Sequence, residues 1–176
     1  MLFILDRDGV INFESEDYIK SPDEWHAIPG SLKAIAMLTQ AGHQIAVATN
    51  QSGVGRKLFS DAMLKKIHQK MLNEVEKSGG KINKIYYCPH TPNDYCDCRK
   101  PKTGLLKEIF KDFKINPADT ILIGDNLRDL EAGANMGCQL ILVKTGHGEL
   151  TAKNLSAFHH DVLIFDNLLQ AVNALS

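Results

Sequence analysis

The sequence predicts an α/β protein built on a doubly wound, Rossmann-like parallel sheet. Short apolar runs alternate with segments of helical periodicity along the chain, and the runs are continuous, as in strands buried on both faces. Polar residues directly follow several runs, at the place where open parallel sheets bind their ligands. No repeat, low-complexity segment or linker interrupts this pattern, so we expect residues 1–176 to form one domain.

Strands are predicted at short apolar runs bounded by polar residues or glycine, namely at 2–5, 44–48, 82–88, 120–124, 140–143 and 162–165. Helices are predicted where apolar residues recur every three or four positions, namely at 31–41, 60–78, 103–113, 127–136 and 166–175. Ser31, Thr103 and Asp166 suit the N-caps of their helices. Gly42 and Gly137 are stop signals after two of the helices.

The composition is that of an ordinary globular protein, with 44% hydrophobic residues, 23% charged residues and a formal net charge of −1. A chain of 176 residues can bury a full core without disulfides. The near-neutral charge argues against nucleic-acid binding. No apolar run is long enough to span a bilayer, and the N-terminal segment lacks the basic region of a signal peptide. We therefore expect a cytoplasmic monomer that acts on a small molecule, with no nucleic-acid or membrane partner.

Polar residues after the first, second and fourth predicted strands, with one from the loop after the third, are candidates for a single site: Asp6, Asp8, Thr49, Asp125 and Lys100. Asp6 and Asp8 are two residues apart, so both can face one pocket while Arg7 points away. Clustered carboxylates repel each other and need a cation. A hard divalent ion with oxygen ligands, Mg²⁺, fits that need best.

The same residues suit a phosphate monoester as the ligand. Mg²⁺ and one lysine would offset much of the negative charge that the carboxylates and a phosphate of about two charges bring together. The turn at 49–53 adds a hydroxyl and backbone N–H donors for phosphoryl oxygens. An isolated Asp-X-Asp pattern is most often a turn or a solvated edge, so the prediction of an enzyme site depends on the joint pattern at strand ends.

Four potential metal ligands lie close together in the chain, namely Cys88, His90, Cys96 and Cys98. Three thiolates and an imidazole suit a closed, structural Zn²⁺ site. The spacing is tighter than in common zinc fingers, so the residues alone leave an incidental cysteine-rich loop or an oxidised pair as alternatives. Cys138 lies beside a predicted strand and is expected in the core.

The motifs Asp6-Arg7-Asp8-Gly9, Thr49, Lys100 and Gly124-Asp125 resemble the four motifs of the haloacid dehalogenase (HAD) superfamily of phosphotransferases. The segments 48–53 and 96–101 are more specific and are similar to the heptose bisphosphate phosphatases and the histidinol-phosphate phosphatase domain. The resemblance covers nearly the whole chain. It implies Mg²⁺-dependent removal of the 7-phosphate of D-glycero-D-manno-heptose 1,7-bisphosphate, a step towards lipopolysaccharide precursors. The spacing of the motifs leaves no room for a separate cap domain.

The resemblance also implies a role for each motif residue. Asp6 is the nucleophile that forms an aspartyl-phosphate, and Asp8 protonates the leaving alcohol and then activates water. Mg²⁺ is held by Asp6, Asp125 and the backbone carbonyl of Asp8. Thr49 hydrogen-bonds the phosphoryl group, and Lys100 stabilises its charge. Members of the family carry the cysteine cluster as a zinc site, which would position the loop that leads to Lys100.

Residues beside these motifs are expected to select the substrate, because the site has no cap. They are Glu14, Asp17, Tyr18, Asn50, Gln51, Ser52, Arg99 and Asn126. Arg99 could hold a second phosphate with its planar guanidinium, or cap a carbonyl or pair on the surface instead. At the position of Asn126, the heptose enzymes that the chain resembles have a lysine. Lys102 is the alternative to Lys100 as the lysine that stabilises the phosphoryl group. His147 is expected to have no functional role.

Two other functions are weighed against heptose bisphosphate hydrolysis. Histidinol-phosphate phosphatase belongs to the same class of enzyme. A phospho-accepting receiver domain of a signalling protein shares the sheet and the acidic pocket, but its aspartate follows the third strand, and it lacks a general acid like Asp8. The candidate nucleophile here follows the first strand, which favours the phosphatase.

Overall fold

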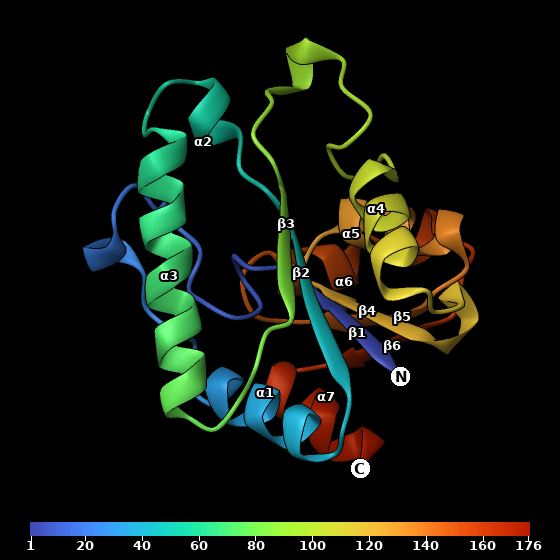
Figure 1. Cartoon of the computed structure of the whole chain (residues 1–176). Helices are drawn as coiled ribbons and strands as arrows, with labels where there is room; N and C mark the ends of the chain where they lie inside the picture. The colour runs from blue at the N-terminus through green and yellow to red at the C-terminus, as the bar shows by residue number, and fades with distance from the viewer.

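The chain folds around one six-stranded sheet with helices on both faces (Figure 1). The computed structural model describes residues 1–176. Its strands are β1 (Leu2–Leu5), β2 (Gln44–Asn50), β3 (Lys84–Cys88), β4 (Thr120–Gly124), β5 (Gln139–Val143) and β6 (Val162–Phe165). The strand order is β3-β2-β1-β4-β5-β6, and every neighbouring pair is parallel. The predicted doubly wound parallel sheet is therefore confirmed.

The helices are α1 (Ser31–Gln40), α2 (Ser52–Gly55), α3 (Asp61–Lys77), α4 (Gly104–Phe113), α5 (Leu127–Met136), α6 (Gly148–Lys153) and α7 (Leu168–Leu175). Short 3-10 helices are η1 (Pro22–Glu24), η2 (Pro92–Asp94), η3 (Pro117–Asp119) and η4 (Leu155–Ala157). Helices α1, α3 and α7 pack on one face of the sheet, and α4 and α5 pack on the other. No helix is both long and apolar enough to cross a membrane.

The two cores explain why the strands are continuous apolar runs. In β1, Phe3 and Leu5 are buried in the core under α1, α3 and α7, whereas Leu2 and Ile4 are buried in the core under α4 and α5. Successive side chains of a strand point to opposite faces. A strand covered on both sides therefore needs an apolar residue at every position.

Two of the predicted N-caps differ from the structure. Gly30, with φ of 89°, occupies the N-cap of α1, and the Ser31 hydroxyl donates instead to the carbonyl of Val10. Thr103 is the N-cap of α4, as predicted, although its side chain makes no cap bond. Asn167, and not Asp166, caps α7 through a bond from the N–H of Gln170. Helices α2 and α6 were not predicted, because each is too short to show a helical period.

The sheet order brings the predicted site residues to one edge. β1 lies between β2 and β4, so the carboxyl ends of these three strands are adjacent. The N–H of Asp6 donates to the carbonyl of Ile123, 3.0 Å away, which continues the β1–β4 pairing beyond the end of the strand. Asp6, Thr49 and Asp125 are thereby held at the same rim of the sheet, where parallel sheets bind their ligands.

Candidate active site

A mostly polar cavity of about 370 Å³ lies at this rim. It is lined by most of the residues that the sequence analysis selected, namely Asp6, Asp8, Glu14, Tyr18, Thr49, Asn50, Gln51, Ser52, Arg99, Lys100 and Asp125. These residues come from the ends of β1, β2 and β4 and from the loops that follow β1 and β3. The structure therefore brings together segments that lie far apart in the sequence.

Three buried carboxylates form the base of the cavity. Oxygen atoms of Asp6, Asp125 and Asp129 all lie within 4.8 Å of one another. Burial and the charge of Asp129 raise the pKa of Asp6 to about 6, although Lys100 lowers it. Burial, with Asp6 and Asp129, raises the pKa of Asp125 to about 9. Such shifts show an excess of negative charge, and a divalent cation with oxygen ligands would offset it.

Lys100 is the cation that the chain itself supplies to this cluster. Its side chain is buried, with Nζ 2.6 Å from Asp129 Oδ1 and 3.1 Å from Asp6 Oδ1. Although burial lowers the pKa of Lys100, the charges of Asp129 and Asp6 outweigh burial and raise it. The exposed Lys102 donates instead to the carbonyl of Cys96. The geometry therefore places Lys100, and not Lys102, beside the candidate nucleophile.

Two glycines allow the backbone to close around Asp125. Gly9 has φ of 84° and Gly146 has φ of 58°, and a Cβ at either position would collide with the Asp125 carboxylate. The backbone N–H of His147 donates to Asp125 Oδ2 at 2.8 Å. Asp125 is thus fixed by the turn after β1 and by the turn after β5, and a side chain at either glycine would push it away.

The Asp8 carboxylate faces a set of donors instead of the other carboxylates. Arg7 donates to it through Nε at 3.0 Å and through Nη2 at 2.9 Å, and the amides of Asn12 and Gln51 each donate at 2.9 Å. Burial raises the pKa of Asp8, but the Arg7 charge and these hydrogen bonds outweigh it and hold the pKa below its usual value. Arg7 does not line the cavity, as expected, yet its guanidinium turns back to the Asp8 carboxylate, which the alternation along a strand could not predict.

The segment after β2 connects the candidate catalytic groups. The Gln51 amide donates both to Asp8 Oδ2 and to Thr49 Oγ1, each at 2.9 Å. Asn50 makes two hydrogen bonds with the backbone of Lys100, to its carbonyl at 3.1 Å and from its N–H at 3.0 Å. Asn50 lines the cavity, but its amide anchors the loop that carries Lys100.

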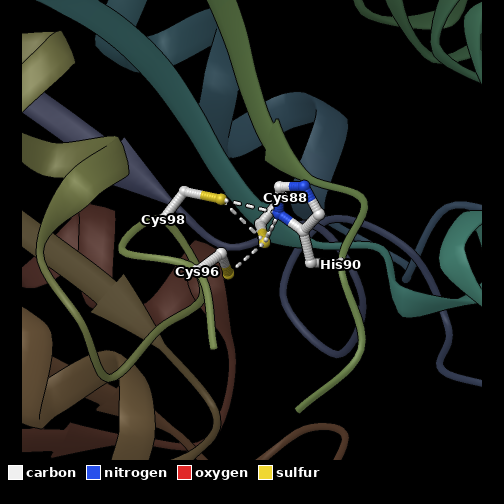
Figure 2. Close-up of side chains that lie close together, drawn as sticks. All are labelled: Cys88, His90, Cys96 and Cys98. Carbon is white, nitrogen blue, oxygen red and sulfur yellow. Dashed lines mark hydrogen bonds between the residues drawn. The ribbon is translucent and has the colours of Figure 1, made fainter. Parts of the chain in front are cut away.

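The four predicted zinc ligands face one another beyond the end of β3 (Figure 2). The sulfur atoms of Cys88 and Cys96 are 3.6 Å apart, those of Cys88 and Cys98 are 2.9 Å apart, and His90 Nδ1 lies 3.2 Å from Cys98 Sγ. Zn–S bonds of about 2.3 Å would place two sulfur atoms of a tetrahedral site about 3.8 Å apart. The donor set suits a zinc ion, and the Cys88–Cys96 separation is close to that value, whereas the Cys88–Cys98 separation is shorter. None of the four cysteines forms a disulfide.

Two predicted substrate residues lie outside the cavity lining. Asp17 is exposed, and its carbonyl accepts from Lys20 Nζ. Asn126 caps α5, accepting from the N–H of Arg128, while the Asp129 carboxylate accepts from the N–H of Asn126. The expectation that Asp17 and Asn126 contact the substrate is not supported by their positions, since a turn and a helix cap use these residues.

Several residues of the candidate site were not predicted from the sequence. Asp129 joins the carboxylate cluster, and Arg56, Arg128 and His147 line the cavity. The spacing from Asp125 to Asp129 was an available signal, because an acid in the first turn of the following helix can point back to a strand end. Nothing local distinguishes Arg56, Arg128 or His147, which reach the cavity only through the tertiary fold.

The fold and the site define a class of protein, the HAD-like hydrolases. The profile of the HAD-hydrolase-like family matches residues 97–171. A D-glycero-beta-D-manno-heptose-1,7-bisphosphate 7-phosphatase of Neisseria meningitidis is 49% identical over 96% of this chain and 90% of its own length. The enzyme of that name from Pseudomonas aeruginosa is 47% identical over 99% of this chain and 97% of its own.

A solved structure agrees with these relatives. The D,D-heptose 1,7-bisphosphate phosphatase of B. bronchiseptica, crystallised with magnesium and phosphate, superposes with a TM-score of 0.96 at 44% identity. The alignment covers 99% of this chain and 97% of that one. The chain belongs to the D-glycero-beta-D-manno-heptose-1,7-bisphosphate 7-phosphatase family of HAD-like phosphatases.

Proposed function

We propose that this phosphatase removes the 7-phosphate of D-glycero-D-manno-heptose 1,7-bisphosphate through a phosphorylated Asp6, with Mg²⁺ as its cofactor. The observation that carries the proposal is the arrangement around Asp6, a buried carboxylate next to Lys100, with Asp125 and Asp129 beside it. The relatives named for this reaction support the choice of substrate.

Asp6, Asp125 and Asp129 would hold the magnesium ion, because they offer three carboxylates in one buried cluster. When bound, Mg²⁺ neutralises part of the charge on the phosphoryl group and on these carboxylates. We also propose that the backbone carbonyl of Asp8 is a ligand of the ion. Its carboxylate is held by Arg7, Asn12 and Gln51 and is left for proton transfer.

The chain's own groups account for the two chemical steps. A carboxylate oxygen of Asp6 attacks phosphorus, the P–O bond to the sugar breaks, and Asp8 gives its proton to the departing oxygen. In the second step Asp8 takes a proton from water, which attacks the phosphorus and releases Asp6. The donors around Asp8 favour the ionised form that the second step needs, and the negative charge of an arriving phosphate favours the protonated form for the first step.

Lys100 and Thr49 would hold the phosphoryl group during transfer. Lys100 Nζ is fixed by the carbonyl of Ala48, 2.6 Å away, as well as by Asp6 and Asp129. A buried, pre-oriented ammonium stabilises developing charge without reorganisation, which is the main contribution a protein makes to phosphoryl transfer. Thr49 Oγ1 is oriented by Gln51.

Three arginines support a substrate with a second phosphate. Arg56, Arg99 and Arg128 line the same cavity, and none forms an ion pair with a carboxylate. Arg99 Nη1 is buried without a hydrogen-bond partner. Burial and then the charge of Arg128 lower the pKa of Arg99. Unpaired guanidinium groups of this kind match the bidentate geometry of phosphate, so the cluster favours a bisphosphate over histidinol phosphate.

The cysteine cluster would hold a structural zinc ion. It lies directly before Arg99 and Lys100 in the chain, in a loop with little helix or strand of its own. A closed site of four protein ligands has no open position for substrate. Zinc would therefore act by fixing the loop that carries these two cations. We also propose that the chain works as one domain and as a monomer, since one rim of a single sheet and its loops bring all of the proposed site residues together.

A substrate comparison with Mg²⁺ present and absent tests the proposal. Wild-type protein should hydrolyse heptose 1,7-bisphosphate with a kcat/KM at least about tenfold above that for histidinol phosphate. Arg128→Met should lower kcat/KM for the bisphosphate and leave a heptose 7-monophosphate nearly unaffected. Preference for histidinol phosphate would overturn the substrate. A long-lived phosphorylated protein without turnover would favour a receiver domain.

A further inference from the structure

A buried polar network lies behind Asp8, and none of its groups reaches the cavity. Arg7 is completely buried. One edge of its guanidinium, Nε and Nη2, contacts the Asp8 carboxylate, and its remaining group, Nη1, lies 3.1 Å from Nε2 of His68. Arg7 thus joins a proton-transfer residue at the cavity to a histidine on the opposite side.

The chemistry of arginine fixes the state of His68. A guanidinium has five N–H donors and no acceptor, so the ring nitrogen of His68 that faces it must accept. The ring is therefore neutral and carries its proton on Nδ1. Burial, followed by the charge of Arg7, lowers the pKa of His68 to about 3, which agrees with that neutral form.

His68 occupies a position where an apolar residue is expected. It lies on the buried stripe of α3 with Leu64, Ile67 and Met71, and it is only 6% exposed. Its ring packs edge-on against Tyr87 at 5.9 Å between centroids, and the Tyr87 hydroxyl donates to Asp61 at the first turn of the same helix. The ring is therefore held by packing from β3 and α3.

The acceptor on His68 matters because Arg7 Nη1 has no other hydrogen-bond partner. A buried charged donor left without an acceptor is strongly unfavourable. Without His68 the guanidinium would turn towards another acceptor. Any rotation would carry the Asp8 carboxylate with it, because Arg7 supplies three of the contacts on that group.

We propose that His68 is a positioning residue that sets the orientation of Asp8 through Arg7, so that Asp8 can transfer a proton to the leaving alcohol. The proposal rests on the proposed function of Asp8. His68 touches neither substrate nor metal. Replacing His68 should therefore slow most those reactions whose leaving group must be protonated by an aligned acid. A residue that only stabilises the fold would affect all substrates alike.

The test compares two substitutions and two kinds of substrate. His68→Leu removes the acceptor, whereas His68→Gln keeps an amide oxygen that can accept from Arg7. Each variant is assayed with an alkyl phosphate, heptose 1,7-bisphosphate or another sugar phosphate that wild type hydrolyses, and with p-nitrophenyl phosphate. A nitrophenolate leaves without being protonated, so only the alkyl phosphate needs the acid.

For His68→Leu we expect the ratio of kcat on the alkyl phosphate to kcat on the aryl phosphate to fall about tenfold or more. His68→Gln should keep that ratio within about threefold of wild type. His68→Met replaces the leucine variant if a melting curve shows that the latter is unfolded. An unchanged ratio in the apolar variant, whether both rates stay constant or fall together, overturns the proposal. If wild type itself hydrolyses neither substrate, the proposed function is at fault instead.

Discussion

At the scale of single residues, the site depends on charges held in fixed partnerships. Asp6 and Asp125 have raised pKa values because they are buried beside Asp129, while Asp8 has a lowered pKa because Arg7 faces it. Asp6 and Asp8 are only two residues apart, yet their surroundings shift the pKa values of their carboxyl groups in opposite directions. These surroundings support the proposed roles, which are cation binding and attack on phosphorus for Asp6 and proton exchange for Asp8.

Asp129 provides a test at this scale. Asp129→Asn should raise the Mg²⁺ concentration needed for half-maximal activity and lower kcat by about 100-fold, because the cluster loses one negative charge, which also faces Lys100. The measurement is initial rate against Mg²⁺ concentration. Asp119→Asn, at an exposed aspartate of η3, is the matched control. Wild-type Mg²⁺ dependence in Asp129→Asn would exclude Asp129 from the metal site.

The buried neutral ring of His68 has a consequence for stability. Its folded pKa of about 3 lies below the value of about 6.5 for an unfolded histidine. Between these values the unfolded chain binds a proton that the folded chain does not, so stability falls as the pH falls below 6.5. From pH 7 to pH 5 wild type should lose about 2 kcal/mol more than His68→Gln, measured by urea unfolding at both pH values. Equal losses would mean that His68 titrates normally.

At the scale of elements, the residues proposed for the chemistry lie at strand ends and in the loop between β3 and α4. The side chains of the cysteine cluster lie together at that loop, where we propose the structural zinc ion. Asn50 at the end of β2 bonds the loop to the sheet through the backbone of Lys100. Loss of the cluster should therefore disorganise Lys100 without unfolding the sheet.

Cys98→Ser tests the loop. The purified variant should contain much less than the one zinc per chain expected of wild type, and its kcat should fall at least about tenfold. Elemental analysis gives the zinc content, and circular dichroism shows whether the fold survives. Cys138→Ser, outside the cluster, should keep both zinc and activity. A zinc-free Cys98→Ser enzyme with full activity would contradict the positioning role.

The elements and site residues that could be predicted are those whose signals are local in the sequence. Asp6, Asp8, Thr49 and Asp125 sit at the ends of apolar strands, and the buried strands themselves are visible as continuous runs. Helices α2 and α6 are too short to show a period. Arg56 and Arg128 line one cavity only because the sheet order brings the end of α2 and the start of α5 to the same rim. The Arg7 side chain turns back to the Asp8 carboxylate by rotation about its own bonds. The periodicity of apolar residues carries no information about such rotation.

At the scale of the whole molecule, the fold gathers buried negative charge at one rim of the sheet. Mg²⁺ should therefore stabilise the folded chain, with a rise in Tm of about 5 °C or more at saturation. The rise should be larger at pH 8 than at pH 5.5, because the metal needs ionised carboxylates and the pKa values of Asp6 and Asp125 are raised to about 6 and about 9. Differential scanning fluorimetry with Mg²⁺ or with a chelator measures the rise in Tm. An equal rise at both pH values would contradict this expectation.

The central claim, that Asp6 accepts the phosphoryl group, is tested most directly by trapping the phosphorylated chain. Asp8→Asn should block the attack of water yet still accept phosphate from p-nitrophenyl phosphate, whose leaving group needs no acid. The account predicts a burst of about one nitrophenolate per chain and a phosphate that peptide mass spectrometry locates on Asp6. A burst with the phosphate on another residue, or steady turnover with no covalent phosphate at all, would contradict it.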